Sequence, residues 1–446
     1  MASTYLTRTV GSGGSTTTGT ISFWLKRGDT GATQHFYVNK NTSSNASFSF
    51  LFSSDTIYIN QYDGTSPFNP ANYQINLQTP SVFRDYNAWY HIVLIIDTSN
   101  GTEANRIRLY VNNVQQTLNK VGNQPTVTQN LNVPFLYNGG VSKIGSDYNG
   151  GTNFGGILTH FHFIDGTAYD ASTFGETDAT TGIWKPKTAP SVTYGTNGFF
   201  LKFENSGSMG TDSSGNANNF TVNGTMTQTV DTPSNVFATI NSLDNRFNAG
   251  AAALVIPTLS NGNLQAVGTS AEAGCICNST LAINNGKYYA EYKLSNNNQT
   301  PRFGIISKYL WDSSSFPTAQ TDVAYTYRYD ANKEHNGTVT SYGASYTTGD
   351  IIGIAFDCTN GNLEFYKNGV SQGVAFTGIP SNQDWCFMFV GLLNDTAQAN
   401  FGNGYFGTTA VASAESPDDG VGIFEYSVPT GYKALCTKSI NAQEYS

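Results

Sequence analysis

Few side chains in this chain have the types and spacing that catalysis needs. Glycoside hydrolysis uses two carboxyl groups about 5–9.5 Å apart, yet Glu176-Thr177-Asp178 supplies only part of a Glu-x-Asp-x-x-Glu strand pattern. The pentapeptide Gly369-Val370-Ser371-Gln372-Gly373 matches the Gly-x-Ser-x-Gly motif of a nucleophile elbow. Strand-type residues follow it, however, where that motif needs a helix. His160 and His162 share one face of an expected strand, with no third metal ligand nearby. We therefore expect no catalytic residues.

Two loops carry oxygen-bearing side chains of the kind that calcium prefers. The first loop contains Asp97, Asn100 and Glu103, and the second contains Asp212 and Asn216. The alternative is that these side chains cap turns by hydrogen bonding to the backbone. Calcium is the one cofactor that the sequence suggests, at either loop.

A long segment between residues 307 and 345 combines aromatic rings with amide and hydroxyl groups. Long loops in compact domains are often binding loops, and phenol and indole rings can stack on a sugar while hydrogen bonding at their edges. Three tyrosines alternate here, so one strand face would display three phenols. The alternative is packing within the domain or against another subunit. The expected ligand-binding residues are Trp311, Tyr325, Tyr327, Tyr329 and His335.

The elements that must position these residues are predicted to be strands. Charged residues make up only 12% of the 446 residues and aromatic residues 13%, a composition that favours β-structure over helix. Apolar residues occupy every second position from Ile21 to Leu25, as in a half-buried strand. Residues 89–96 are apolar on both faces, which predicts a central strand covered on both sides. No segment shows a sustained helical period.

The chain also repeats itself. Residues 97–101 lead into a strand-like segment at 108–113, and residues 357–361 lead into a similar segment at 363–369. Each copy follows an apolar segment and contains an Asn-Gly turn signal. The fold class is therefore predicted to be all-β, with two antiparallel β-sandwiches in tandem.

Turn-rich stretches set the expected domain boundaries. The first domain is expected to span residues 1–235, followed by a linker at 236–248. The second domain is expected at 249–407, and residues 408–446 are rich in Gly, Ala and Asp at their start. We expect that last stretch to be an irregular C-terminal tail.

Charge and cysteine content exclude several classes of protein. With 22 Lys and Arg against 31 Asp and Glu, the net charge is −9, which disfavours binding to nucleic acid. No apolar run approaches the length of a membrane-spanning helix, and the N-terminus lacks a secretory apolar region. The five cysteines are an odd set, so synthesis in a reducing cytoplasm is expected. A recognition-type composition without an export signal fits a virus particle released by lysis.

The N-terminal half resembles the concanavalin A-like/laminin-G jelly-roll superfamily. The resemblance rests on residues 89–93, 108–112, 144–145, 154–157 and the Asp-Ser-Ser-Gly-Asn turn at 212–219. The second half is similar to SPRY domains. That similarity rests on residues 286–291, 303–305, 349–354 and 368–376, which occur in the order expected for that family. Both sandwiches are thus expected to be concanavalin A-like, a jelly roll followed by a SPRY-like domain.

The whole arrangement resembles virion structural proteins of marine tailed bacteriophages, through residues 5–8 and 22–27 near the start and 429–436 near the end. The resemblance implies a non-enzymatic protein of the virion surface, made in the host cytoplasm. The expected role is that of a tail fibre or receptor-binding component that attaches to host surface glycans. The alternatives are a head decoration or head-fibre protein and a polysaccharide depolymerase.

The expected partners follow from this role. They are other virion proteins, a host cell-surface glycan and further copies of the same chain, with a homotrimer favoured because attachment gains from multivalency. No nucleic acid and no membrane is expected as a partner.

Overall fold

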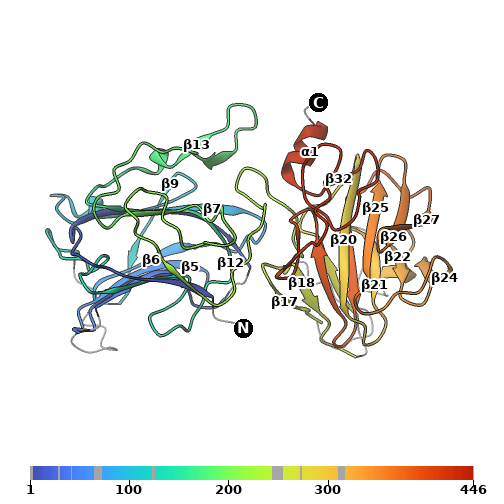
Figure 1. Ribbon diagram of the computed structural model, residues 1–446, viewed down its shortest axis with the longest axis horizontal. Coiled ribbons are helices and arrows are strands. Elements are labelled where there is room, and N and C mark those ends of the chain that lie inside the picture. Colours follow the sequence, from blue (N-terminus) through green and yellow to red (C-terminus); the bar gives the residue numbers. More distant parts are fainter. Residues whose placement is uncertain are drawn as a thin grey trace. The chain divides into compact units, whose positions relative to one another are not determined.

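The computed structural model describes residues 4–28, 31–41, 43–64, 73–122, 126–243, 255–271, 274–309 and 317–444. The chain forms two compact units, Met1–Gln228 and Thr229–Ser446 (Figure 1). The division lies slightly before the expected boundary at residue 235. Residues 236–243 of the expected linker belong to the second unit, where Phe237, Ala238 and Ile240 are buried because their apolar side chains pack into it. Residues 244–248 of that linker lie outside the described part.

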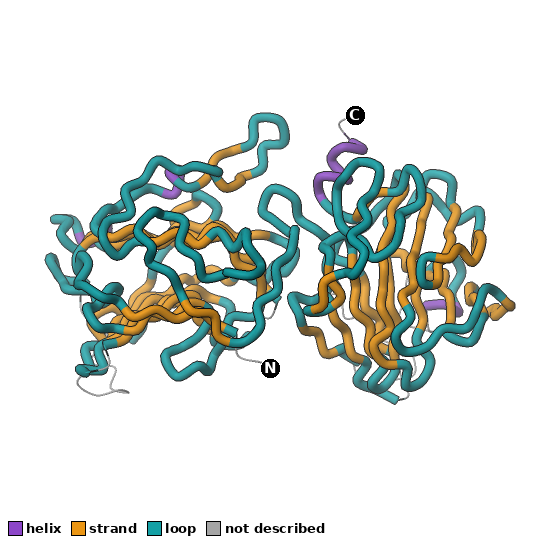
Figure 2. Tube along the Cα trace, viewed as in Figure 1, coloured by secondary structure: helices purple, strands orange, loops and turns teal. Residues whose placement is uncertain are grey.

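The first unit is a sandwich of two antiparallel sheets, whose layers are both visible in Figure 2. One sheet has the strand order β10 (Asn119–Lys120), β6 (Tyr73–Val82), β5 (Thr56–Tyr62), β4 (Ser47–Ser53), β3 (Gln34–Lys40), β11 (Val141–Ile144), β1 (Tyr5–Thr9) and β16 (Thr221–Asn223). The other has the order β15 (Phe199–Leu201), β12 (Gly156–Asp165), β2 (Thr18–Arg27), β7 (Trp89–Asp97), β8 (Ile107–Val111) and β9 (Val114–Gln116). A short hairpin joins β13 (Gly175–Thr177) to β14 (Trp184–Pro186).

Strand periodicity explains the core of the first unit. Ile21, Phe23 and Leu25 of β2 alternate into the space between the sheets and are almost fully buried. The neighbouring strand β7 is buried on both faces, as its sequence predicted. The prediction of tandem antiparallel sandwiches is confirmed for this unit.

The second face of β7 is covered by a polar and aromatic cluster. His91 is fully buried, its ring stacks on Trp24, and its Nδ1 accepts a hydrogen bond of 3.0 Å from the indole N–H of Trp184 on β14. Its Nε2 lies 2.9 Å from the Ser22 hydroxyl, so the neutral ring donates there. Burial lowers the pKa of His91 to about 3, and the charge of His160 acts in the same direction. His91 is therefore a neutral packing residue.

His160 and His162 also serve packing. His162 is buried, stacks on Phe200 at a centroid distance of 3.9 Å and shares a hydrogen bond with the Tyr194 hydroxyl. The ladder of β12 is irregular between Thr159 and His162, which breaks the simple alternation expected for the two histidines.

The second unit is also a sandwich. One sheet has the order β17 (Thr258–Ser260), β18 (Gln265–Val267), β29 (Thr396–Asn400), β20 (Lys287–Asn296), β25 (Ile351–Asp357), β26 (Asn362–Lys367) and β27 (Val370–Phe376), with β32 (Lys433–Ala434) also paired to β20. The facing sheet has the order β19 (Cys275–Asn278), β28 (Trp385–Gly391), β21 (Arg302–Ser307), β22 (Ala324–Arg328), β23 (Asn332–His335) and β24 (Thr338–Ser341). All five cysteines are buried.

The internal repeat predicted from the sequence is present in atomic detail. In the first unit, Asn112 opens the turn between β8 and β9 with a φ of 49°, and its backbone and side chain hydrogen-bond to His91 O and N at 2.8 and 2.7 Å. In the second unit, Asn368 opens the turn between β26 and β27 with the same φ and bonds to Ile351 O and N, both at 2.8 Å. Asparagine tolerates this left-handed conformation better than most residues.

The C-terminal stretch needs a correction. Residues 408–446, expected to be an irregular tail, contain β31 (Thr409–Ala410), which pairs with β30 (Tyr405–Phe406), as well as β32 and the helix α1 (Thr437–Glu444). Phe424, Ala434 and Cys436 pack with Tyr289 against the outer face of the β20 sheet. The stretch is an integral part of the second unit because its apolar side chains cover this face. No helix of the described residues is long and apolar enough to cross a membrane.

Candidate ligand-binding site

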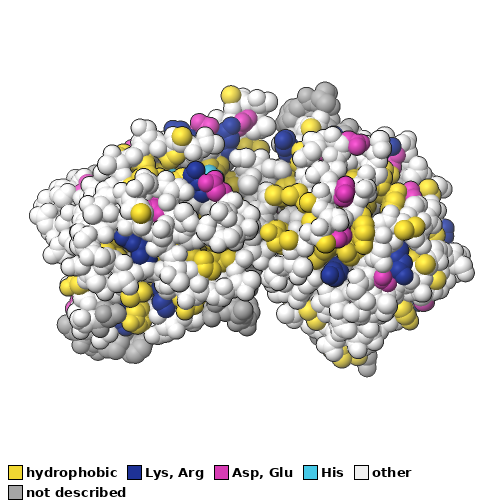
Figure 3. All heavy atoms as spheres, in the orientation of Figure 1, with side chains coloured by type: hydrophobic (Ala, Val, Ile, Leu, Met, Phe, Trp, Pro, Cys, Tyr) yellow, Lys and Arg dark blue, Asp and Glu magenta, His cyan; other side chains and the backbone are white. Residues whose placement is uncertain are grey.

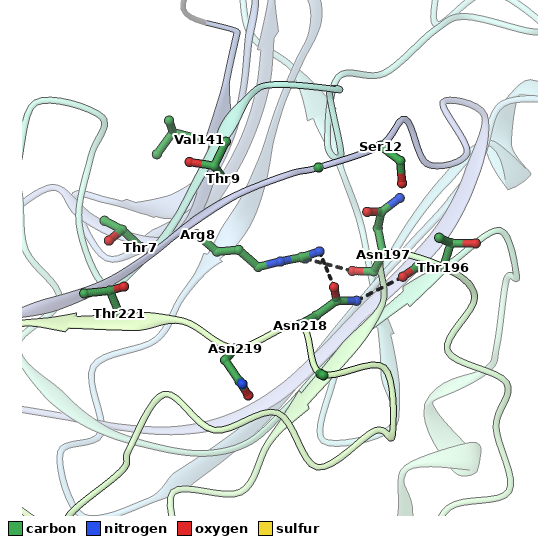
Figure 4. A pocket seen from close by; sticks show the side chains of 12 residues that line it. Thr7, Arg8, Thr9, Ser12, Val141, Thr196, Asn197, Asn218, Asn219 and Thr221 are labelled. Atoms are coloured by element: carbon green, nitrogen blue, oxygen red, sulfur yellow. Dashed lines mark hydrogen bonds between the residues drawn. The ribbon is translucent and has the colours of Figure 1, made fainter.

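A groove of about 760 Å³ opens in the first unit next to β1 and β16. Its lining comes from β1 and the residues after it, from the loop before β15 and from the loop before β16, as Figure 4 shows. Hydroxyl and amide side chains dominate this lining, with one guanidinium at the centre. The lining residues are Thr7, Arg8, Thr9, Gly11, Ser12, Val141, Thr196, Asn197, Ala217, Asn218, Asn219 and Thr221.

Arg8 links the walls of the groove. One of its terminal nitrogens donates to the backbone oxygen of Asn197 at 3.0 Å, and the other donates to the side-chain oxygen of Asn218 (Figure 4). The amide nitrogen of Asn218 in turn donates to the backbone oxygens of Thr196 and Gly198. Burial lowers the pKa of Arg8, while the charges of nearby acidic groups oppose that shift. Arginine stays protonated at any ordinary pH, so the groove holds a positive charge.

Sequence patterns alone did not predict this site. Residues 5–8 and 212–219 carried a family resemblance, and Asp212 and Asn216 a possible calcium loop, whereas the structure brings Arg8 and Asn218 from these two segments into contact. A usable signal was present: Arg8 lies in phase with the buried Leu6 and Val10, where a strand of this type normally places an apolar side chain.

The tyrosines expected to bind a ligand in the second unit are buried instead of exposed. Tyr325 and Tyr327 share one face of β22, but that face is directed into the core, and their exposed fractions are 4% and 0%. Tyr329 packs partly buried against the same core. The expected display of three phenols is therefore wrong, because alternation groups side chains on one face without saying which face is inward.

His335 and Trp311 complete the expected set. The His335 ring stacks on Tyr325 at a centroid distance of 3.9 Å, and its Nδ1 donates to the backbone oxygen of Ala324 at 3.0 Å. The side chain is only partly exposed and belongs to the packing around Tyr325. Trp311 lies outside the described residues.

Comparisons with known families agree with this architecture. Residues 2–172 match the family model described as the concanavalin A-like lectin/glucanases superfamily, and residues 287–404 match the SPRY domain. The chain carries a concanavalin A-like domain followed by a SPRY domain. The resemblance to these two families is thus confirmed; the comparisons say nothing about a bacteriophage origin.

Related proteins share part of the chain. Ran-binding protein 9 from Danio rerio is 32% identical over 124 residues, which cover 26% of this chain and 20% of that protein. The ATP-dependent RNA helicase DDX1 from Xenopus laevis is 31% identical over 130 residues, 29% of this chain and 16% of the helicase. The chain therefore matches about a fifth or less of the length of these relatives.

Solved structures match parts of the chain. The SPRY domain of human HERC1 is 20% identical with a TM-score of 0.29, and the match covers 32% of this chain and 91% of that domain. A pentraxin from Limulus polyphemus is 17% identical with a TM-score of 0.27, covering 38% of this chain and 72% of the pentraxin.

The first expected calcium loop of the concanavalin A-like domain is held by hydrogen bonds. Asp97 Oδ1 accepts from the Ser99 hydroxyl at 2.6 Å, and Asn100 Oδ1 accepts from the backbone N–H of Thr102 at 3.0 Å. Glu103 forms an exposed ion pair with Lys120. These oxygens are engaged in turn and surface contacts.

The second expected calcium loop is engaged more fully. Asp212 accepts four hydrogen bonds, from the backbone N–H groups of Phe200, Ser214 and Asn218 and from the Ser214 hydroxyl, all at 2.8 Å. Asn216 donates to two backbone oxygens. In the described part of the chain no three His, Cys, Asp or Glu residues are grouped to hold a metal. The residues of both loops thus fit turn capping and do not fit a calcium site.

We therefore expect calcium to leave the stability of the concanavalin A-like domain unchanged. Protein freed of calcium with a chelator should melt within about 1 °C of the same protein in about 10 mM calcium, a concentration that fills even weak extracellular sites. Differential scanning fluorimetry measures this. A calcium-dependent rise of several degrees that Asp212→Asn abolishes would contradict the turn-capping interpretation.

Tyr327→Phe tests the buried position of the SPRY-domain tyrosines. The Tyr327 hydroxyl donates to the backbone oxygen of Ala344, so its removal should lower the free energy of unfolding by about 1 kcal/mol. Binding of any ligand to the domain surface should not change, because the phenol does not reach the surface. Tyr309→Phe, at a tyrosine that is 69% exposed, is the control and should leave stability unchanged. Lost binding with unchanged stability in Tyr327→Phe would contradict this placement.

The elbow-like pentapeptide is part of a hairpin of the SPRY domain. Ser371 lies on β27, and its hydroxyl donates to the Glu364 carboxylate on the neighbouring strand β26. A nucleophilic serine instead needs a base that removes its proton and a strained strand-to-helix turn. The strained strand-to-helix turn is missing here, because Ser371 lies within a strand that continues to Phe376.

Proposed function

We propose that this chain is a non-enzymatic surface protein of a tailed-bacteriophage virion that attaches to host surface glycans, as a tail fibre or receptor-binding component. The observation that carries the proposal is the groove of the concanavalin A-like domain, because its hydroxyl, amide and guanidinium groups are suited to sugar hydroxyls. The family description, which names lectins, agrees with such a role. The sequence resemblance at residues 5–8, 22–27 and 429–436 supports the virion origin.

The proposal includes the absence of catalysis. Glycoside hydrolysis needs two carboxyl groups on either side of the bond, and none of the described residues that line the groove carries one. We expect the purified protein to release no reducing ends from host polysaccharide. Release that disappears when one carboxylate is replaced would favour a depolymerase instead.

The proposed partners are other virion proteins, a host glycan and further copies of the chain, with a trimer favoured because multivalency strengthens weak glycan contacts. On the face shown in Figure 3, the Lys and Arg side chains are scattered, and several lie beside Asp or Glu side chains. This distribution supports the proposal that neither nucleic acid nor membrane is bound.

Immunogold labelling of intact virions tests the proposed location on the virion surface. Label on the tail tips supports host attachment, and label on the head favours the decoration or head-fibre alternative. Virions without label would contradict both. Soluble protein should also compete with virions for adsorption to host cells, and protein that fails to compete would contradict the attachment role.

A further inference from the structure

We infer that the groove next to β1 takes a saccharide that carries a carboxylate, and that the Arg8 guanidinium receives this carboxylate. The inference rests on the glycan-binding function proposed above and adds the chemical class of the ligand. Four features of the groove carry it: the position of Arg8, its neutral contacts, the state of the nearby carboxylates and the composition of the lining.

The strand places Arg8 where a charge is costly. Leu6 and Val10 are fully buried on the inner face of β1, and Arg8 lies between them on the same face, partly exposed where the groove opens. A guanidinium in this position loses part of its hydration, and that loss must be balanced by hydrogen bonds or by an opposite charge. An apolar residue would fit the strand pattern without this cost.

The contacts of Arg8 satisfy only part of its hydrogen-bonding capacity, and none of them neutralises its charge. Its two partners are the backbone oxygen of Asn197 and the amide oxygen of Asn218, both neutral. A guanidinium has five N–H groups, and three of those of Arg8 are not used in these two hydrogen bonds. Among the described residues, no carboxylate forms an ion pair with Arg8 within 4.0 Å.

The nearest acidic side chains are committed elsewhere. Asp212 accepts the four hydrogen bonds described above, and Asp165 accepts from the backbone N–H groups of Ser15 and Asn197 at 2.7 and 3.0 Å. Neither residue lines the groove. These carboxylates shape the loops and help to keep Arg8 charged, while the guanidinium faces the groove (Figure 4).

The rest of the lining indicates a saccharide. Its hydroxyl and amide groups can exchange hydrogen bonds with sugar hydroxyls, and its volume is within the range of about 300–1,000 Å³ that is usual for small-molecule sites. The described lining contains no aromatic ring on which a sugar could stack. Specificity must therefore come from polar contacts and from the single charge. A planar carboxylate matches the planar guanidinium in both shape and charge.

Calorimetric titration of the full-length chain with three matched probes tests this inference. The probes are a trisaccharide of galacturonic acid, its methyl ester and the corresponding trisaccharide of galactose. The acid should bind at least tenfold more tightly than the two neutral probes, since a charge-assisted contact is worth at least that factor. The preference should shrink as salt is raised. This comparison needs no variant, so it stands even if substitution of Arg8 impairs folding.

Substitutions test whether the preference for the acidic probe arises in the groove. Arg8→Gln should bind all three probes equally, and Arg8→Lys should keep part of the preference because it retains the charge without the planar geometry. Arg84→Gln, at an arginine outside the groove whose side chain is 59% exposed, should bind as the unmodified chain does. Each variant is first compared with the unmodified chain by its melting temperature.

The outcomes separate this inference from the proposed function. Equal or tighter binding of the neutral probes, or of host glycans without acidic groups, would overturn the inference and leave glycan attachment in place. A preference for the acid that persists in Arg8→Gln would also overturn it. Stronger binding of a sulfated galactose trisaccharide than of the galacturonic acid probe would overturn the carboxylate assignment. Failure to bind any of these saccharides would contradict both.

Discussion

Replacing Asp55 by asparagine is expected to lower the free energy of unfolding of the concanavalin A-like domain by about 3–5 kcal/mol. Asp55 forms an ion pair of 2.9 Å with Arg27, whose side chain is completely buried and lies over the Phe52 ring. Asp55 also accepts a hydrogen bond of 2.7 Å from the Gly31 N–H. Without the carboxylate, the Arg27 charge stays buried and uncompensated, which is the costly situation for a broken buried pair.

The substitution separates charge from backbone effects. Asp55 has a φ of 70°, a conformation that asparagine tolerates. Arg84→Gln removes the second cation on the same carboxylate, but the Arg84 side chain is 59% exposed, so this control should cost less than about 1 kcal/mol. Urea unfolding of the full chain, monitored by hydrogen exchange of amides in this domain, measures the loss of stability in both variants. Equal effects of the two variants would contradict the assigned role of the buried pair.

The Asp55 pair also predicts how stability depends on pH. Burial raises the pKa of Asp55, but the hydrogen bonds from Gly31, Arg84 and Arg27 outweigh burial, and the pKa lies below its usual value. A lowered pKa in the folded state gives stability that is fully present above the unfolded value of about 3.9 and lost as the pH falls through the folded value. Asp55→Asn should remove this contribution, so its stability should fall less steeply below about pH 4.

Glu291→Gln is expected to destabilise the SPRY domain by about 2–3 kcal/mol at pH 5. The Glu291 side chain is fully buried on β20, and its two oxygens accept from the backbone N–H groups of Glu425 and Tyr426 at 2.9 and 3.0 Å. Glutamine has a single acceptor oxygen, so its NH₂ group must face one of these N–H groups. The Tyr289 hydroxyl donates to the Glu291 carboxylate at 3.3 Å. When Glu291 is protonated, this hydroxyl can rotate to accept the carboxyl proton, so both Glu291 oxygens stay available to the two amides.

The pH dependence at Glu291 has the opposite sign to that at Asp55. Burial raises the pKa of Glu291 to about 7, against the hydrogen bonds that favour its charged form. A raised pKa gives stability that is fully present below the unfolded value of about 4.5 and lost as the pH rises through 7. The shift corresponds to about 3 kcal/mol. Glu291→Gln should abolish this slope, so its deficit should be smaller at pH 8 than at pH 5.

Glu415→Gln is the matched control for Glu291, because it lies exposed in the same C-terminal stretch that covers β20. It should change neither the stability at pH 5 nor the slope. Denaturant unfolding at a series of pH values between about 4.5 and 8, monitored by the fluorescence of the SPRY domain, measures the stability and its dependence on pH. A slope that persists in Glu291→Gln would show that another group titrates.

Much of the fold could be predicted from local sequence patterns. Alternation at residues 21–25 and the apolar run at 89–96 predicted two strands, since side-chain direction in a strand repeats every two residues. The run at 89–96 is covered on both faces as predicted, but the strand at 21–25 is not half-buried, because Ser22 and Trp24 on its second face are buried too. The repeated Asn-Gly signals at 97–101 and 357–361 predicted a hairpin in each unit, and β7 pairs with β8 as β25 pairs with β26. The first of these connections is longer than a tight turn, because it contains a short 3-10 helix at Glu103–Asn105. These features depend on neighbours in the chain, so the sequence contains them directly.

The candidate sites could not be predicted in the same way. Alternation correctly grouped Tyr325 and Tyr327 on one face, but tyrosine suits both a core and a binding surface, and only the facing sheet makes that face inward. Asp97 and Asp212 have side chains suited to calcium and to turn capping alike. Their hydrogen-bond partners, which decide between the two, are fixed by the folded loops.

By itself, the sequence determined the strands, the turns, the two related sandwiches and their families. The tertiary structure decided which polar side chains meet. Arg8 and Asn218 are 210 residues apart, and Glu291 is more than 130 residues from the two amides that it accepts. Contacts at such separations depend on the order in which strands pair and on the packing of covering segments. A local pattern specifies a residue's own strand and not the distant backbone that folding places beside it.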